Sequence, residues 1–416
     1  MILIGDPLED HLRQVKEGNK MNQKDRINQN NQKNSFWTVM IYMAADNNLD
    51  EAALRDISEM AKAGSTDEVH PVKYPKGGSK AAFHGVNITV QLDRAVDQKT
   101  RRFLITKDGG YEKDCIETFE ETNTGDPKVL EDFILWAIKN YPSKRYMLIL
   151  WNHGGGWWED PRRSIAYDDS SQGDALDNKE LKQVLLNIKE RIGRPIDILG
   201  MDACLMQMLE VAYQLRDCVD YMVGSEEEEP VDGWPYDLIL KNLIKKPKVH
   251  PKGLSIRVVK EYIRSYRGTG EDVTQSAISL DKISTVIAPL NHLSRLLIEN
   301  LEDENTLHAI ESAWRQSPRF FRNNYVDLHR FTRLLKAKSK QKEIKRAADE
   351  LLRALRPGKR RFVIYHKSLG RRMRHTKGVS VYFPRWWINP RYRELDFYKD
   401  CLWGRFIESY LNMKGA

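Results

Sequence analysis

The chain has 416 residues, of which 41% are hydrophobic and 30% charged, and it carries a formal net charge of +8. These are globular proportions, and the length allows one large domain or two. No apolar run reaches 18 residues, which excludes a membrane-spanning helix. The mild positive charge permits acidic partners without requiring nucleic acid.

The first 35 residues contain no apolar core segment, and from Lys20 to Asn34 they are almost wholly Asn, Gln, Lys, Asp and Arg. Such a segment cannot bury enough apolar surface to fold, so we expect residues 1–35 to form a disordered N-terminal extension. The segment also lacks the apolar centre of a Sec-type signal peptide. On this ground we expect a cytoplasmic location.

The first half of the chain alternates segments of strand type and helix type. Apolar strands are predicted before His153 and Cys204 and at 37–45, 86–95 and 221–227, with a peripheral hairpin at 101–108 and 115–121. Helices are predicted between them, at 47–64, 126–142, 178–191 and 204–217. Strands that alternate with helices indicate an α/β fold with a mostly parallel sheet.

The second half is richer in helical spacing. Helices are predicted at 251–266, 281–302 and 327–355, and strands at 274–281 and 378–384. The basic, proline-containing segment KKPKVHPKG marks a boundary between the halves. We therefore divide the folded chain into a core at 36–246 and a C-terminal α/β portion at 247–416 that packs on it.

One stretch of the C-terminal portion, 351–393, contains thirteen Lys and Arg residues and no Asp or Glu. We interpret it as a solvated basic face around one strand. The alternative is a surface for an anionic partner, with Trp386 and Trp387 available for stacking.

Two residues carry the chemistry of the sequence. His153 and Cys204 each follow an apolar strand, and Cys204 comes about 50 residues after the histidine, an order and spacing typical of caspase-type cysteine peptidases. The carboxyl ends of parallel strands meet at one edge of a sheet, so the two side chains are expected to face one crevice. Either residue alone is more often structural, but together they predict a Cys/His catalytic dyad.

The backbone near these residues suits the same chemistry. We expect Cys204 to open a helix, whose N-terminal partial charge would favour the thiolate. The backbone N–H groups of Gly154 and Cys204 are candidates for holding the oxyanion of a tetrahedral intermediate. The other three cysteines, Cys115, Cys218 and Cys401, lack such a setting, and we expect reduced thiols without a metal site.

Acidic residues near the predicted dyad suggest a substrate preference. Asp202 lies two residues before Cys204, so a strand places both on one face, and Asp232 follows the next predicted strand. Both are candidates for a substrate-binding pocket, and an acidic pocket favours Arg or Lys just before the scissile bond. We interpret the run Glu226–Glu229 as a solvated loop.

Several segments together resemble the clostripain family of cysteine peptidases, in the caspase-like clan. They are WTVMIYMAADNNLD, LILWNHGGGW, DILGMDACLMQMLEVAYQL, VGSEEEEPVDGWPYD, YVDLHRF and GVSVYFP. The resemblance implies a caspase-like α/β/α sandwich with a mostly parallel sheet and additional C-terminal helices. It also implies a cysteine endopeptidase that cleaves after Arg or Lys. The histidine and nucleophile of the family carry over to His153 and Cys204, and its pocket aspartates to Asp202 and Asp232.

The resemblance has further implications. Members of the family are often zymogens that cut themselves in the loop after the histidine, where this chain has Arg162 and Arg163 as candidate processing sites. No cofactor is required, although calcium dependence occurs in the family, and residues 226–229 are the acidic cluster that we consider for it. We expect peptide or protein substrates, a monomer, no membrane association and no nucleic acid.

The alternative is a non-catalytic caspase-like regulatory or binding protein with an anionic-partner surface at 351–393. It predicts binding that is strongly salt-dependent and survives the loss of Cys204. A hydrolase of small amides is a third reading, which failure to cut peptides would distinguish.

Overall fold

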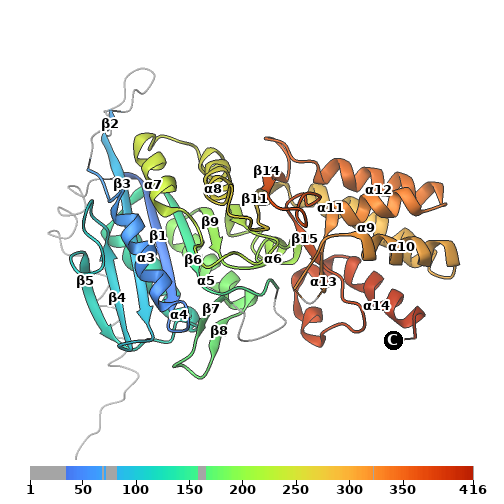
Figure 1. Ribbon diagram of the computed structural model, residues 1–416, viewed down its shortest axis with the longest axis horizontal. Coiled ribbons are helices and arrows are strands. Elements are labelled where there is room, and N and C mark those ends of the chain that lie inside the picture. The colour runs from blue at the N-terminus through green and yellow to red at the C-terminus, as the bar shows by residue number, and fades with distance from the viewer. Residues whose placement is uncertain (1–33, 68–69, 72–81, 158–164, 322, 416) are drawn as a thin grey trace, which may run out of the picture.

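The computed structural model describes residues 34–67, 70–71, 82–157, 165–321 and 323–415 (Figure 1). Within these ranges the largest sheet has ten strands, and its five central strands are parallel. Antiparallel strands extend it on both sides. The order across the sheet is β14 (Val363–Ser368), β11 (Thr274–Ser279), β10 (Val219–Gly224), β9 (Ile196–Asp202), β6 (Ser143–Trp151), β1 (Ser35–Ala45), β3 (Ala82–Arg94), β4 (Lys99–Leu104) and β5 (Cys115–Glu120), with β2 (His70–Pro71) paired to β3.

Strand β1 lies between β6 and β3, and all eleven of its residues are buried. Its continuous apolar sequence follows from this position, because a strand covered on both faces has no polar side.

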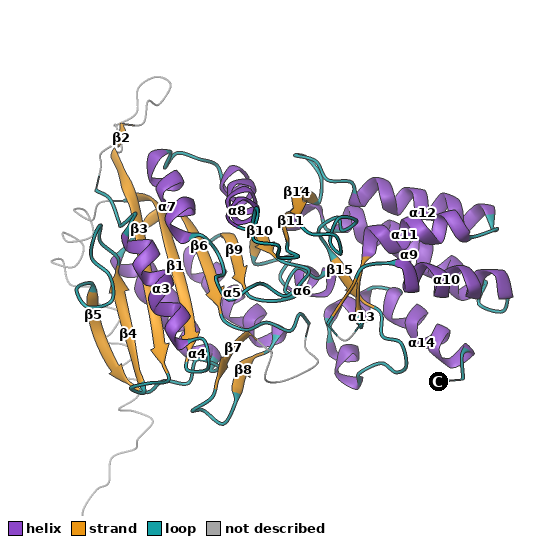
Figure 2. Cartoon of the chain, in the orientation of Figure 1, coloured by secondary structure: helices purple, strands orange, loops and turns teal. Residues whose placement is uncertain are grey.

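Helices cover both faces of the sheet, and each face has its own hydrophobic core (Figure 2). One core contains α4 (Pro127–Asn140) and α5 (Asn178–Ile192), and the other contains α3 (Asp50–Ala61), α7 (Tyr236–Lys245) and α8 (Pro251–Ser265). The predicted α/β/α sandwich with a mostly parallel sheet is confirmed.

Helix α5 shows how local sequence fixes the ends of these elements. The side chain of Asp177 accepts hydrogen bonds from the backbone N–H groups of Lys179 and Glu180 and so caps the first turn. Gly193 ends the helix with φ of 73°, a conformation that glycine adopts without strain.

The additional C-terminal helices gather at one end of the molecule (Figure 1). They are α9 (Ser284–Glu299), α10 (Glu304–Gln316), α11 (Leu328–Lys338), α12 (Lys342–Leu355) and α14 (Trp403–Met413), with the short α13 (Asp396–Asp400) nearby. A small sheet accompanies them, made of β12 (Arg319–Phe320), β13 (Tyr325–Asp327) and β15 (Ser380–Tyr382). A hairpin of β7 (Ile165–Asp168) and β8 (Asp174–Leu176) lies beside the main sheet.

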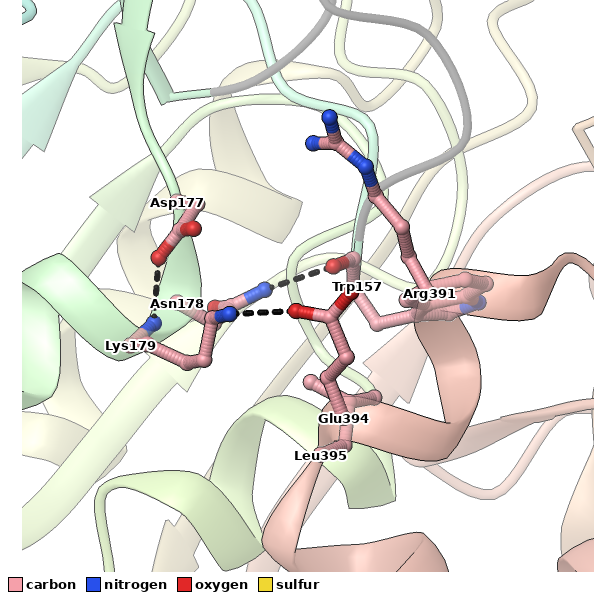
Figure 3. Close-up of a pocket in the computed structure, with 7 residues that line it drawn as sticks. All are labelled: Trp157, Asp177, Asn178, Lys179, Arg391, Glu394 and Leu395. Atoms are coloured by element: carbon pink, nitrogen blue, oxygen red, sulfur yellow. Dashed lines mark hydrogen bonds and ion pairs between the residues drawn. The ribbon is translucent and has the colours of Figure 1, made fainter.

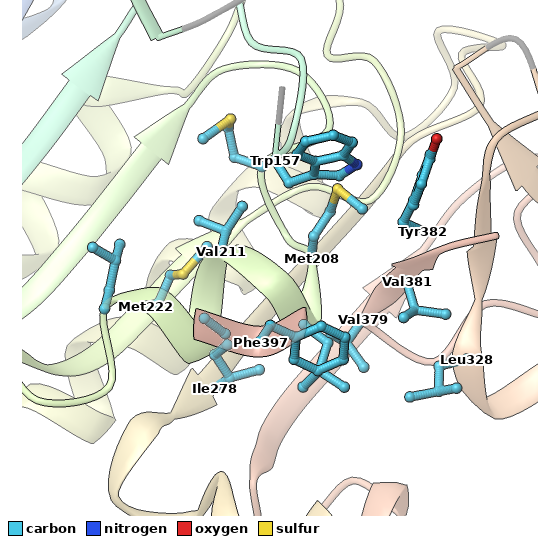
Figure 4. Close-up of a cluster of buried hydrophobic side chains, with 14 of the residues drawn as sticks. Trp157, Met208, Val211, Met222, Ile278, Leu328, Val379, Val381, Tyr382 and Phe397 are labelled. Carbon is cyan, nitrogen blue, oxygen red and sulfur yellow. The ribbon is translucent and has the colours of Figure 1, made fainter. Parts of the chain in front are cut away.

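The C-terminal portion is tied to the segment that follows Cys204. Ser380 donates its backbone N–H to the carbonyl oxygen of Gln207 at 3.1 Å. Side chains of β15 pack in the same cluster as Met208 and Trp157 (Figure 4), and the ring centroids of Trp157 and Tyr382 are 5.1 Å apart. The boundary at 246/247 stays a prediction, and β11 and β14 of the second portion extend the main sheet.

Two predicted helices differ from those observed. The segment 327–355 forms two helices, because the chain becomes extended at Ser339 and restarts at Lys342. The helix predicted from Cys204 begins only at Leu209, as α6 (Leu209–Gln214).

Candidate active site

The strand register brings His153 and Cys204 to the same edge of the sheet. Strands β6 and β9 are parallel neighbours, and their last paired residues are Trp151 and Asp202. The backbone N–H of Asn152 donates to the carbonyl oxygen of Asp202 at 3.3 Å. His153 and Cys204 therefore each lie two residues beyond the same rung of the sheet, as the sequence predicts.

Gly154 brings the two strand ends into direct backbone contact. A Cβ atom at this residue would lie 2.2 Å from the carbonyl oxygen of Cys204 and 3.0 Å from its backbone nitrogen. Only glycine permits this approach. In the part of the chain that the structure describes, the N–H of Gly154 donates to no protein acceptor, so it remains a candidate oxyanion donor together with the N–H of Cys204.

The half-buried His153 has a partner that the sequence analysis missed. Its Nε2 lies 2.7 Å from Oδ1 of Asn48, an exposed residue three positions after the end of β1. Asn48 belongs to the polar run Asp46–Asn48, which directly follows a buried strand and so ends at the same edge as the dyad. That run was the signal in the sequence.

Cys204 does not open a helix, so the predicted helix-terminus effect on its thiol is wrong. The following residues run alongside the 225–227 segment instead, since Leu205 donates to Glu227 and Gln207 donates to Ser225 through backbone groups. Leu205 takes φ of 66° to make this turn. The half-buried sulfur accepts a hydrogen bond from the backbone N–H of Glu229 at 3.3 Å, and this donor favours the thiolate.

The remaining cysteines differ from Cys204 in exposure and surroundings. All four are free thiols. Burial raises the pKa of both Cys218 and Cys401 to about 12, whereas Cys115 is exposed on the edge strand β5. Neither buried thiol is placed to react at neutral pH.

Asp202 lies beneath the candidate site as a buried carboxylate. It accepts hydrogen bonds from the Tyr236 hydroxyl at 2.7 Å and from the backbone N–H of Trp234 at 3.4 Å. Burial raises its pKa to about 6. Burial and the charge of Asp202 raise the pKa of Glu229 well above its usual range. At neutral pH the pair therefore carries one negative charge, on Asp202.

The structure leaves Asp232 exposed, at the start of the turn that covers Asp202. A Cβ atom at Gly233, the next residue, would lie 3.1 Å from Oδ1 of Asp202. Asp232 therefore directly precedes the residue that packs against the carboxylate of Asp202. Its role in a substrate-binding pocket stays a prediction.

The interpretation of Glu226–Glu229 as a solvated loop is wrong. Glu226 is only 1% exposed and Glu227 is 7% exposed. Glu226 accepts from the backbone N–H of Gly378 at 2.8 Å, and Glu227 forms an ion pair with Arg372 at 3.0 Å. The run anchors the end of β10 to the C-terminal portion.

The candidate processing residues Arg162 and Arg163 lie outside the described residues. Trp157, the last described residue before them, lines a pocket (Figure 3). The side chain of Asn178 donates a hydrogen bond to its carbonyl oxygen at 2.9 Å. An ion pair between Lys179 and Glu394 lines the same pocket. The pocket contains neither His153 nor Cys204, and its lining comprises Trp157, Asp177, Asn178, Lys179, Arg391, Glu394 and Leu395.

The surface alternative keeps some support from exposed aromatic side chains. Trp386 is 60% exposed and Trp387 is 64% exposed within the basic stretch.

No helix in the described ranges has the length and apolar character needed to span a bilayer.

Solved structures share this fold. A C11 cysteine protease from Bacteroides thetaiotaomicron, in complex with an irreversible peptide inhibitor, aligns with a TM-score of 0.63 at 22% identity, over 90% of this chain and 99% of its own. An inactive zymogen C11 protease from Parabacteroides distasonis aligns with a TM-score of 0.63 at 20% identity, over 89% and 99%. The predicted caspase-like fold is confirmed by these similarities.

The cytoplasmic location expected from the sequence is contradicted. The similar protease from Bacteroides thetaiotaomicron is described as secreted, which points away from the cytoplasm.

A curated relative and a family profile agree on the family. Clostripain from Hathewaya histolytica is 34% identical over 235 residues, which cover 51% of this chain and 43% of clostripain. The match thus spans less than half of the length of that relative. The profile of the clostripain family, peptidase family C11, matches residues 41–410. Because this match extends over most of the sequence, the chain belongs to the clostripain family.

Proposed function

We propose that the chain is a cysteine endopeptidase with a dyad of His153 and Cys204, cleaving after Arg or Lys. The observation that carries the proposal is the common position of the two residues, each two beyond the paired Trp151 and Asp202. Membership of the clostripain family supports it.

In this mechanism the thiolate of Cys204 attacks the carbonyl carbon of the scissile peptide bond. The N–H of Glu229 stabilises the thiolate before attack, and the N–H groups of Gly154 and Cys204 receive the oxyanion. Protonated His153 gives its proton to the leaving amine, and a thioester remains on Cys204. His153 then takes a proton from water, which hydrolyses the thioester and restores the thiol.

Asn48 assigns the two nitrogens of His153 to different tasks. If Oδ1 of Asn48 accepts, Nε2 carries the proton, and Nδ1 is the nitrogen that exchanges a proton with Cys204 and substrate. Asn48 is in this proposal a positioning residue. No organic cofactor enters the reaction, because each group is supplied by the chain.

The substrate preference follows from the charge beneath the nucleophile. Asp202 precedes Cys204 by two residues and keeps the single negative charge of its buried pair with Glu229 at neutral pH. A cationic side chain would be attracted to it in surroundings of low polarity. Exposed Asp232 would add a second carboxylate near the mouth.

Hydrolysis of a fluorogenic peptide panel tests the proposed function. Peptides with Arg, Lys, Asp, Asn or Leu before the scissile bond are incubated with the chain and a reductant. We expect cleavage after Arg and Lys alone. Cleavage after Asp or Asn would contradict the pocket assignment, and no cleavage, even after limited trypsin nicking of 159–169, would favour the non-catalytic alternative.

Replacing Asn48 tests the positioning role. We expect Asn48→Ala to lower kcat by about tenfold to a hundredfold with little change in KM, since the imidazole loses its orientation but the pocket is intact. The neighbouring replacement Asn47→Ala is a poor control because Asn47 bonds two carbonyl oxygens. Exposed Glu51→Ala on the same helix entry serves instead, and an equal loss in both variants would contradict the role.

Processing is tested with Arg162→Ala/Arg163→Ala. We expect purified wild type to contain two fragments that meet at these residues, and the double variant to remain one chain with reduced peptide hydrolysis. The control is Cys204→Ala, which should stay intact alone and be cut when wild-type enzyme is added. An uncut wild type with full activity would contradict self-processing.

A further inference from the structure

Four carboxylates converge at the carboxyl edge of the sheet, separate from the candidate dyad. One oxygen each from Asp46, Asp93, Glu121 and Asp168 lies within 4.8 Å of those of the other three. They come from four segments: the residue after β1, the end of β3, the residue after β5 and the end of β7. The tertiary fold, rather than one local loop, therefore collects them.

Two of the four side chains have buried oxygens without donors. Asp93 is completely buried, and its Oδ1 accepts from the Thr100 hydroxyl at 2.8 Å, whereas its Oδ2 has no hydrogen-bond partner among the described residues. Both carboxylate oxygens of Glu121 are also buried without a hydrogen-bond partner there. Buried charged oxygens of this kind are strongly unfavourable unless a cation or donor meets them.

No protein cation meets them in the described part of the chain, where none of the four forms an ion pair with Lys or Arg. Arg94, next to Asp93 in sequence, binds Asp50 at 2.5 Å, and Arg102 on β4 binds Asp132 at 2.6 Å. Burial is the first cause that raises the pKa of Asp93 to about 8. The charges of the neighbouring carboxylates, among them Glu121 and Asp168, raise it further.

We propose that Asp46, Asp93, Glu121 and Asp168 bind a divalent cation, and that the ion is calcium. The ligands are all oxygens of carboxylates, which suit a hard cation and not zinc, since neither His nor Cys takes part. Calcium binds oxygen at about 2.4 Å, so a set of oxygens that all lie within 4.8 Å of one another can surround it. Magnesium usually keeps several of its water ligands and is bound through one or two carboxylates, so a set of four carboxylates suits calcium better.

The acidic run that the sequence suggested for calcium is a weaker candidate. Glu226 and Glu227 already bind Gly378 and Arg372, respectively. The new site instead uses residues more than a hundred positions apart, a pattern that is invisible as a loop motif in the sequence.

The proposed ion would brace the segments that hold His153. Asp46 precedes Asn48 by two residues, and Asn48 contacts the imidazole. The carbonyl oxygen of Tyr167, next to Asp168, accepts from the side chain of Asn152 at 3.2 Å. A cation shared by Asp46 and Asp168 would thus fix the chain on both sides of His153. The binding itself does not depend on the proposed peptidase activity.

Calorimetric titration with calcium chloride tests the site. The full chain carries Cys204→Ala, which prevents self-digestion, and is first freed of metal with EDTA. We expect one calcium ion per chain, and at least a tenfold weaker affinity in Asp93→Asn and in Glu121→Gln. The matched control is Glu120→Gln, which removes the same charge from an exposed neighbouring residue and should leave the affinity unchanged.

Thermal unfolding gives a second readout with a defined sign. In EDTA, Asp93→Asn should melt at a higher temperature than its parent because repulsion within the cluster is relieved. In calcium the parent should gain stability that the variant does not gain. The proposal is overturned if the parent binds no calcium, or if Asp93→Asn and Glu121→Gln bind it as tightly as the parent does.

Discussion

The replacement Cys204→Ala is expected to lower the kcat/KM for Arg and Lys peptides by about 10⁴-fold or more, because no other group can form the thioester. The fold should survive, since the variant loses one half-buried sulfur atom and its hydrogen bond from Glu229. His153→Ala should cause a loss of similar size, and the double variant should be no worse than either single one. Initial rates with the fluorogenic panel measure these values.

The matched control is Cys115→Ala, which removes an exposed thiol from an edge strand. It should retain full activity and remain sensitive to a thiol-alkylating reagent. Activity that persists in Cys204→Ala, or that disappears in Cys115→Ala, would place the nucleophile elsewhere. Peptide hydrolysis that is absent from the wild type as well would return the non-catalytic reading to first place.

The position of His153 and Cys204 at the carboxyl edge of the sheet was predictable from the sequence, because it depends on the short apolar strands that precede them. Apolar strands before His153 and Cys204 end at the same rung, and parallel strands leave no other edge for the residues that follow. The buried β1 was recognisable for a similar reason, since its continuous apolar sequence is typical of a strand that is covered on both faces.

The contacts between distant segments were not predictable in this way. Cys204 fails to open a helix because the chain after it pairs with residues 225–227, and nothing in the local sequence specifies that partner. Likewise, Glu226 is typical of a solvated loop by composition, but Gly378 lies 152 positions away and supplies its donor. In both places, contacts with distant segments overrode the preference of the local sequence.

Asp202→Asn is expected to lower kcat/KM for Arg peptides by about a hundredfold or more, because a cationic side chain would lose its buried counter-charge. A peptide with citrulline in place of Arg has the same shape without the charge, and its hydrolysis should change little. The ratio of the two kcat/KM values isolates the charge, since both substrates use the same His153 and Cys204.

The pH dependence of that ratio gives a second expected result. Burial raises the pKa of Asp202 to about 6, so the carboxyl is neutral below this pH and charged above it. The preference for Arg over citrulline should therefore rise between pH 5 and pH 7 and then level off, as kcat/KM follows the ionisation of the free enzyme. In Asp202→Asn the ratio should stay low and flat over the same range.

Glu229→Gln is the matched control for the pair. It removes the partner whose pKa is raised well above its usual range, and it leaves the charge on Asp202 and the backbone N–H that donates to Cys204. The preference for Arg should persist in this variant. Its midpoint should stay close to that of the parent, because Glu229 is already uncharged where Asp202 ionises and the Gln amide can replace its hydrogen bond to Asp202. An Arg preference that survives Asp202→Asn but falls in Asp232→Asn would instead assign the pocket to the exposed carboxylate.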